Sequence, residues 1–247
     1  MLEIRHYSEF NNGALIYIMK SNHGFFYQLK KMNVLDFEIT TIGDLDESID
    51  TLCEFFGEDD QDNSLAEEYC PYFGVLWEAG IGLSQHIEKM DVKGKRVLEI
   101  GCGLALPSFL VTKMGAEIIA TDFHADVPLF LELNQKQNNI KFPYRVMNWR
   151  NEIERTKSDL GLFDLVLGSD ILYESQHPMQ VAKALIAFLK PGGKIILADP
   201  GRAYIQKFIT SMNECGYKEH FTTQTVKAEL TPKNKQRDIF IFEYSAS

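Results

Sequence analysis

The chain has 247 residues, of which 45% are hydrophobic, so it is long enough to bury one α/β core and is neither disordered nor fibrous. Its formal net charge is −10 at pH 7, and Lys and Arg form no cluster. Because affinity for a phosphate backbone depends on clustered cations, this composition argues against a nucleic-acid partner. The four cysteines form no C-x-x-C pair and share no metal-ligand spacing with histidine, which predicts reduced thiols and no zinc site.

The start of the chain carries no targeting pattern. The residues MLEIRHYSEFNN are charged and polar where a secretory signal has its apolar centre, and the run ALIYIM is too short to span a bilayer. We therefore expect a soluble, cytoplasmic protein without a membrane partner.

Residues 1–69 predict a β-rich and acidic N-terminal extension. Within residues 14–42, the runs ALIYIM, FFYQL and DFEITTI are rich in β-branched and aromatic residues and predict a small antiparallel meander. From Asp44 to Glu68 the chain carries many acidic residues and no Lys, Arg or His. The favoured interpretation of this acidic stretch is a solvated, partly mobile loop, and the alternative is a surface that attracts a basic partner.

Residues 70–247 predict a doubly wound α/β domain, because buried strands alternate with helices. The expected strands are RVLEIG, EIIATD, PYRVMN, FDLVLGSDILY and KIILADP. The expected helices are one that begins near Trp77, then ALPSFLVTKMG, DVPLFLELNQKQNN, HPMQVAKALIAFLK and AYIQKFITSMNECG. Two further runs, HFTTQTVKAEL and DIFIFEYS, suit an antiparallel pair that closes the sheet.

The turn Gly101-Cys102-Gly103 follows the first of these strands, where doubly wound sheets bind ligands. A dinucleotide-binding turn needs a small residue at position 106, which is Leu here, and the Gly-Lys-Ser/Thr of a phosphate-binding loop is missing. The turn therefore predicts a nucleoside ligand without a large phosphate group.

Two acidic residues narrow the choice of ligand. Asp122 ends the second strand, where a carboxylate can accept both ribose hydroxyls. Glu99 lies in a buried run and needs a cation or donors, which an amino-acid ammonium would supply; the alternative is a strand acid satisfied by backbone donors. A ligand with a ribose and an α-amino group is S-adenosylmethionine, and E-I-G-C-G resembles the first motif of the class I methyltransferases.

The motifs PYFGVLWEAGIGL, EIGCG, ATD, NWRN, SDILYE and ADPGR follow one another in this order over residues 70–245. Together they resemble the D-x-x-Y family of protein methyltransferases, many of which modify lysine. This resemblance implies a Rossmann-like seven-stranded sheet whose last strand is antiparallel. One departure is Asn148-Trp149, where the family usually has Asp before Trp; the amide oxygen can still accept a hydrogen bond from adenine, without the charge.

The resemblance also implies the site. Asp170 and Tyr173 are the expected catalytic residues, Asp170 to aim the acceptor amine and Tyr173 to flank its aliphatic stem. The alternative for Asp170 is a helix N-cap. The expected cofactor-binding residues are Trp77, Glu99, Gly101, Cys102, Gly103, Asp122, Phe123, Asn148, Trp149 and Ser169. Trp149 is expected to lie at the edge of the adenine. Trp77 is almost equally consistent with an ordinary core aromatic. Glu78 is a candidate second acid at the site, and His177 is expected to start a helix rather than to act as a catalyst.

The expected function is that of an S-adenosylmethionine-dependent N-methyltransferase that modifies a lysine of a protein substrate. If the acidic stretch recruits this substrate, the substrate has a basic surface. No metal is expected. Two alternatives stay open: a small-molecule amine N-methyltransferase on the same fold, and a non-catalytic cofactor-binding module.

Overall fold

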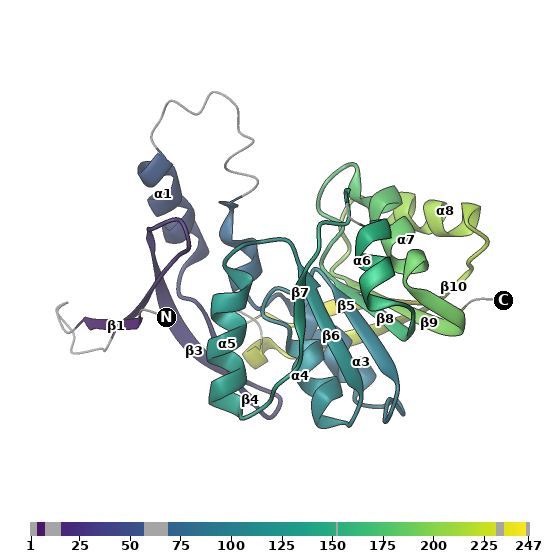
Figure 1. Cartoon of the computed structure of the whole chain (residues 1–247), viewed down its shortest axis with the longest axis horizontal. Helices are drawn as coiled ribbons and strands as arrows, with labels where there is room; N and C mark the ends of the chain where they lie inside the picture. The colour runs from purple at the N-terminus through teal and green to yellow at the C-terminus, as the bar shows by residue number, and fades with distance from the viewer. Residues whose placement is uncertain (1–3, 8–15, 57–68, 152, 231–234, 246–247) are drawn as a thin grey trace. The chain divides into compact units, whose positions relative to one another are not determined.

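The computed structural model describes residues 4–7, 16–56, 69–151, 153–230 and 235–245 (Figure 1). Contacts divide the chain into two compact units. The first unit comprises Met1–Val75 with His124–Asn139, and the second comprises Leu76–Phe123 with Ile140–Ser247. The domain boundary expected after residue 69 stays a prediction.

The first unit contains a four-stranded antiparallel sheet with the order β1-β2-β3-β4. Its strands are β1 (Ile4–Tyr7), β2 (Ile16–Lys20), β3 (Phe26–Val34) and β4 (Phe37–Ile42). Strands β2, β3 and β4 form the meander that the sequence predicts, although residues 14–15 of its first run lie outside the described residues. Strand β1 was not predicted.

The first half of the acidic stretch is a helix, so the interpretation as a loop is wrong there. Helix α1 spans Leu45–Phe56. Asp44 directly precedes the helix, and its Oδ1 accepts the backbone N–H of Glu47 at 3.1 Å. The helix buries Leu52. Residues 57–68, the second half of the acidic stretch, lie outside the described residues.

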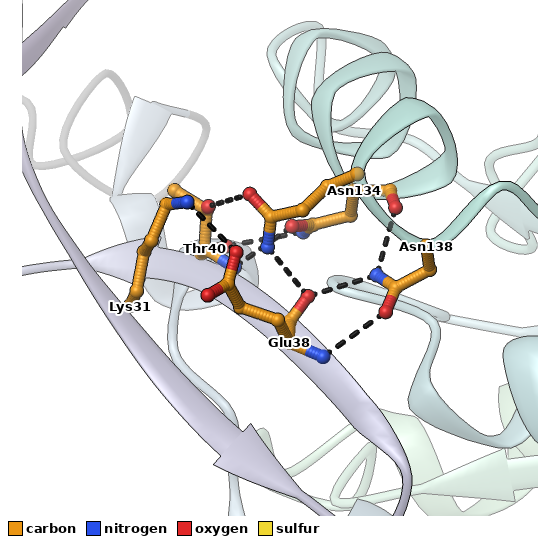
Figure 2. Close-up of polar contacts among 6 residues, drawn as sticks. Lys31, Glu38, Thr40, Asn134 and Asn138 are labelled. Carbon is orange, nitrogen blue, oxygen red and sulfur yellow. Dashed lines mark hydrogen bonds and ion pairs between the residues drawn. The ribbon is translucent and has the colours of Figure 1, made fainter.

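Helix α5 (Val127–Asn138) follows its predicted range and belongs to the first unit. Its side-chain amides bind the main chain of β4 (Figure 2). Asn134 accepts the N–H of Thr40 at 2.8 Å and donates to the carbonyl of Thr40 at 3.1 Å. Asn138 does the same for Glu38, at 3.0 and 2.8 Å. Two asparagines one helical turn apart thus replace a neighbouring strand and cover the edge of β4.

The first unit has an aromatic core. A short 3-10 helix, η1 (Pro71–Gly74), places Phe73 edge-on to Phe130 of α5 at 5.3 Å between ring centroids. Tyr27 packs against the same two rings, and its hydroxyl donates to Asp126 at 2.8 Å. This buried hydrogen bond fixes the start of α5 to β3.

The second unit contains a seven-stranded sheet with the order β10-β11-β9-β8-β5-β6-β7. Its strands are β5 (Arg96–Ile100), β6 (Glu117–Asp122), β7 (Tyr144–Val146), β8 (Phe163–Ser169), β9 (Leu189–Asp199), β10 (Glu219–Val226) and β11 (Arg237–Ser245). Strands β5 to β9 are parallel, and β11 runs antiparallel to both β9 and β10. The Rossmann-like sheet with an antiparallel last strand is confirmed.

Helices cover the sheet of the second unit. They are α3 (Glu78–Ile87), α4 (Leu106–Lys113), α6 (Ile153–Leu160), α7 (His177–Ala187) and α8 (Ile205–Glu214), with a 3-10 turn η2 (Ala228–Leu230). Alternate strand residues such as Leu98 and Val166 share one core with α7 and α8. On α3, a Cβ at Gly82 would lie 2.9 Å from Ile239 of β11, so that helix packs directly on the sheet. Helix α6 was not predicted from the sequence. Within the described residues, no helix has the length and apolar sequence to cross a membrane.

Candidate active site

The residues expected to form the site lie at one edge of the sheet in the second unit. Strands β9, β8, β5 and β6 are neighbours and parallel, so their carboxyl ends meet there. Asp199, Ser169, Gly101 and Asp122 lie at or directly after these ends. Chain order reverses between β5 and β8, which is where sheets of this type bind ligands.

The glycine turn is shaped by the packing of the chain itself. Gly101 has a φ of 61° and Gly103 a φ of 49°. A Cβ at Gly101 would lie 2.6 Å from Cγ2 of Ile171 and 3.1 Å from the ring of Trp149, so only glycine fits. The N–H of Cys102 donates to the carbonyl of Thr121 at 3.0 Å, which fastens the turn to β6.

Asp122 holds the end of β6 against this turn. Its Oδ2 accepts the N–H of Gly103 at 2.9 Å, and its Oδ1 accepts the N–H of Phe123 at 2.7 Å. A carboxylate has about four acceptor sites, so these two bonds do not exhaust its capacity. The hydroxyl of Tyr144 donates to the Asp122 carbonyl at 3.0 Å and adds support that the sequence did not reveal.

Glu99 is fully buried, and only one of its two carboxylate oxygens has hydrogen-bond partners among the described residues. Its Oε2 accepts the backbone N–H of Ser108 at 3.1 Å and also the Ser108 hydroxyl. Its Oε1 has no hydrogen-bond partner among the described residues. Burial raises the pKa of the Glu99 carboxyl to about 8, although the Ser108 bonds oppose this rise. Donors from the chain thus satisfy one oxygen, and a cationic ligand group suits the other.

Asp170 follows β8 in a left-handed conformation, with a φ of 57°. The expected strand FDLVLGSDILY therefore ends at Ser169. The N–H of Asp170 donates to Ala198 of β9 at 2.9 Å, and α7 has its N-cap at Gln176, so the N-cap interpretation of Asp170 is wrong. A left-handed residue other than glycine is strained, and such residues cluster at functional sites.

Arg202 binds Asp170 and was not assigned a role from the sequence. Its Nε donates to Oδ1 of Asp170 at 2.5 Å. Asp199, at the end of β9, accepts the backbone N–H groups of Gly201 and Arg202 at 2.8 and 2.7 Å and so orients the arginine. Burial raises the pKa of Asp170, and the Arg202 guanidinium opposes this rise. In the sequence, Arg202 is the last residue of the ADPGR motif, and this motif was the signal that could have drawn attention to it.

Tyr173 and Trp149 both pack on His177, the first residue of α7. Ring centroids lie 4.6 Å apart for Tyr173 and His177 and 5.7 Å apart for Trp149 and His177, both edge-on. His177 Nδ1 donates to the carbonyl of Ile171 at 2.9 Å, which fixes the ring. Tyr173 is 36% exposed, and burial of its hydroxyl followed by the charge of Asp122 raises its pKa. His177 starts a helix, as expected, and also braces the aromatic pair.

The start of α3 reaches the same edge of the sheet. Trp77 is the half-buried N-cap of α3, and Glu78 is its first residue. A Cβ at Gly80 would lie 3.5 Å from Oγ of Ser169, and the negative charge of Glu78 helps to raise the pKa of Asp170. The charge of Glu78 therefore acts on the expected catalytic carboxylate.

Asn148 has a local structural partner. Its Oδ1 accepts the N–H of Arg150 at 3.0 Å and so closes the turn that follows β7. The expected adenine contacts of Asn148 and Trp149 stay predictions. Trp149 is buried, and its Nε1 has no hydrogen-bond partner among the described residues.

These residues fit S-adenosylmethionine. Glu99 offers a buried, unpartnered carboxylate oxygen that suits the ammonium, and Asp122 offers a carboxylate at the strand end that suits the ribose. The fold and this arrangement of acids define a class I S-adenosylmethionine-dependent methyltransferase. Comparison with known proteins extends this assignment to a family: a family model described as lysine methyltransferase matches residues 61–215. The match covers more than half of the chain, which therefore belongs to this family, and the resemblance seen in the motifs is confirmed.

Curated relatives and solved structures agree with this assignment. The chain is 36% identical over 111 residues to the histone-arginine methyltransferase METTL23 of Xenopus laevis. This alignment covers 42% of this chain and 47% of the relative. It is 29% identical over 114 residues to a ubiquinone biosynthesis O-methyltransferase of Xanthomonas oryzae pv. oryzae, which covers 46% of each chain. The matched region thus spans about half the length of these relatives.

Two solved structures share the fold. A ribosomal protein L11 methylase of Lactobacillus delbrueckii subsp. bulgaricus has a TM-score of 0.52 at 17% identity. The superposition covers 69% of this chain and 79% of the methylase chain. A methyltransferase complexed with SAH has a TM-score of 0.56 at 11% identity. This superposition covers 96% of this chain and 57% of the other chain. S-adenosylmethionine is therefore the cofactor that the family and the fold both support.

Proposed function

We propose that this protein methylates a lysine side chain of a protein substrate. S-adenosylmethionine supplies the methyl group: the C–N bond forms as the S–CH3 bond breaks, sulfur keeps the electron pair, and nitrogen loses a proton to solvent. The family description supports lysine as the acceptor. The observation that carries the proposal is Asp170, a strained and buried carboxylate at the carboxyl end of β8 beside Tyr173.

Asp170 has a defined task in this reaction. A lysine must lose its proton before it can attack, and with a reference pKa of about 10.4 this costs roughly 4 kcal/mol near pH 7.4. Asp170 then accepts an N–H of the neutral amine, aims its lone pair and offsets the positive charge that forms on nitrogen. Tyr173 presents a ring that can flank the aliphatic stem of the lysine.

Three other functions compete with lysine methylation. The relative named a histone-arginine methyltransferase raises arginine as an acceptor. The O-methyltransferase relative raises a small molecule, and a binding module without activity is the third. Incubation of a heat-inactivated cell lysate with the protein and methyl-labelled S-adenosylmethionine separates them, when the label is followed both in the small molecules and in the proteins hydrolysed to amino acids. We expect labelled methyl-lysine; labelled methyl-arginine alone, label confined to small molecules, or no label would overturn the proposal.

Replacing Asp170 by Asn tests the catalytic role. The variant keeps the shape of the side chain but loses its charge, so methyl transfer should fall by about a hundredfold, while S-adenosylhomocysteine still binds. Calorimetry and the lysate assay measure the two effects separately. Tyr173→Phe keeps the ring and should cost less. Loss of cofactor binding in Asp170→Asn would instead make Asp170 a cofactor ligand.

A further inference from the structure

Arg202 occupies one of the two oxygens of Asp170. Its Nε donates to Oδ1 at 2.5 Å, and among the described residues Asp170 makes no other side-chain hydrogen bond or ion pair. Oδ2 is therefore the oxygen left for a substrate. The Asp170 side chain is only 5% exposed, whereas that of Arg202 is 33% exposed, so the guanidinium is the more accessible member of this ion pair.

This arrangement treats an amine and a guanidinium differently. An arginine side chain binds a carboxylate best through two parallel N–H bonds to both oxygens, and a single open oxygen cannot provide them. A lysine amine needs only one acceptor. Moreover, a guanidinium keeps its charge at any physiological pH and is repelled by Arg202, whereas an amine can enter in its neutral form.

We propose that Arg202 is a specificity-determining residue that selects an amine over a guanidinium at Asp170. This inference rests on the proposed function and assigns the acceptor class to the same site. The charge of Arg202 also favours the neutral form of the entering amine, because a nearby positive charge lowers an amine pKa. Asp199 holds the Arg202 backbone in place, and Glu78 and Arg237 are the other charged groups that act on Asp170.

Two side-chain analogues, n-butylamine and n-butylguanidine, test the inference without an identified substrate. Each is titrated into the protein loaded with S-adenosylhomocysteine, and binding is followed by the NMR shift of the Asp170 amide. We expect the wild-type protein to bind the amine at least about tenfold more tightly, equivalent to about 1.4 kcal/mol. In Arg202→Gln this preference should disappear. Arg237→Gln is the matched control, because Arg237 is exposed and acts on Asp170 only through its charge.

A preference that survives in Arg202→Gln, equal binding of both analogues to the wild-type protein, or no saturable shift with the amine would overturn the inference. If Arg202→Gln does not fold, the pH dependence of the wild-type protein decides. Since the neutral amine binds, its affinity should rise by close to tenfold per pH unit between pH 7 and 9, and that of the guanidine should stay flat. An amine affinity that does not change with pH would overturn the inference.

The lysate assay keeps the two proposals apart. Methyl-lysine in the lysate with an unchanged analogue preference in Arg202→Gln overturns only the role of Arg202. If Arg202→Gln loses the analogue preference but the wild-type protein forms no methyl-lysine in the lysate, only the proposed function is overturned.

Discussion

Glu99 carries its proton near neutral pH, because burial raises the pKa of its carboxyl to about 8. One of its oxygens is unpartnered, which a neutral carboxyl tolerates far better than a charged one. A cationic ligand group changes this balance, because it stabilises the charged form. Binding of an ammonium at Glu99 must therefore displace the proton.

This linkage gives a calorimetric prediction. Binding of S-adenosylhomocysteine near pH 7 should release close to one proton, so the observed heat should differ between buffers with different ionisation enthalpies. Glu99→Gln cannot ionise and should bind more weakly, with the same heat in every buffer. Equal heats for the wild-type protein in all buffers would show that binding displaces no proton from Glu99.

The same carboxyl predicts a pH dependence of stability. Its pKa is about 8 in the folded chain against an ordinary value of 4.5, so the folded state binds more protons between these two values. The contribution of Glu99 is fully present below pH 4.5 and is lost as pH rises through 8, with a slope of at most about 1.4 kcal/mol per pH unit. Denaturant unfolding at several pH values should show this slope in the wild-type protein and a flatter profile in Glu99→Gln.

Sequence order was enough to place the acids of the site but not their partners. Asp122 ends β6 and Asp170 follows β8, and the carboxyl ends of these strands meet at that of β5, so their proximity to the glycine turn was predictable. Arg202 was not, because its role depends on the reach of a long side chain from the loop after β9 to the loop after β8. Its pairing is a property of three-dimensional neighbours, which spacing along the chain does not encode.

At the scale of elements, α5 replaces a fifth strand beside β4. The main-chain groups of Glu38 and Thr40 bind the side-chain amides of Asn138 and Asn134 (Figure 2). An exposed strand edge invites pairing with other chains, and the two asparagines prevent it here. Because Asn134 is fully buried, the pair that it forms with Thr40 is shielded from water.

Asn134→Leu keeps much of the volume but leaves two main-chain groups of Thr40 unsatisfied. Each buried unsatisfied group costs about 1–3 kcal/mol, so loss of both bonds should make local opening of β4 easier by about 2–6 kcal/mol. Hydrogen exchange of the Thr40 amide measures this opening directly and should accelerate. Glu132→Gln, at an exposed position of the same helix, is the control and should leave the exchange unchanged. Equal exchange in both variants would show that the amide pair carries no stability.

Hydrophobic periodicity predicted most elements and missed those that depend on polar signals. Strands β5, β6, β8 and β9 and helices α4, α5 and α7 bury regular apolar patterns, which is why their positions followed from the sequence. Helix α1 was hidden because its acidic composition suggested a solvated loop. The overlooked signal was Asp44 with Glu47 three residues later, a pattern typical of a helix start.

At the scale of the whole molecule, the net charge of −10 is concentrated in part on α1. Asp46, Asp50 and Glu54 are exposed and four residues apart, so they share one face of the helix. Like charges at this spacing destabilise a helix, and α1 has no basic residue in its last turn to offset them. Such a stripe suits the recruitment of a basic protein surface, which we propose as its role.

Neutralising this stripe tests that role. Asp46→Asn, Asp50→Asn and Glu54→Gln combined should slow association with a lysine-rich synthetic peptide and weaken its dependence on salt, because the local field that steers the encounter is lost. Surface-plasmon resonance at several salt concentrations measures both effects. The matched control combines Glu154→Gln, Asp159→Asn and Glu229→Gln, which remove the same charge from exposed positions elsewhere. If both triple variants slow association equally, net charge alone attracts the partner and the stripe on α1 has no special role.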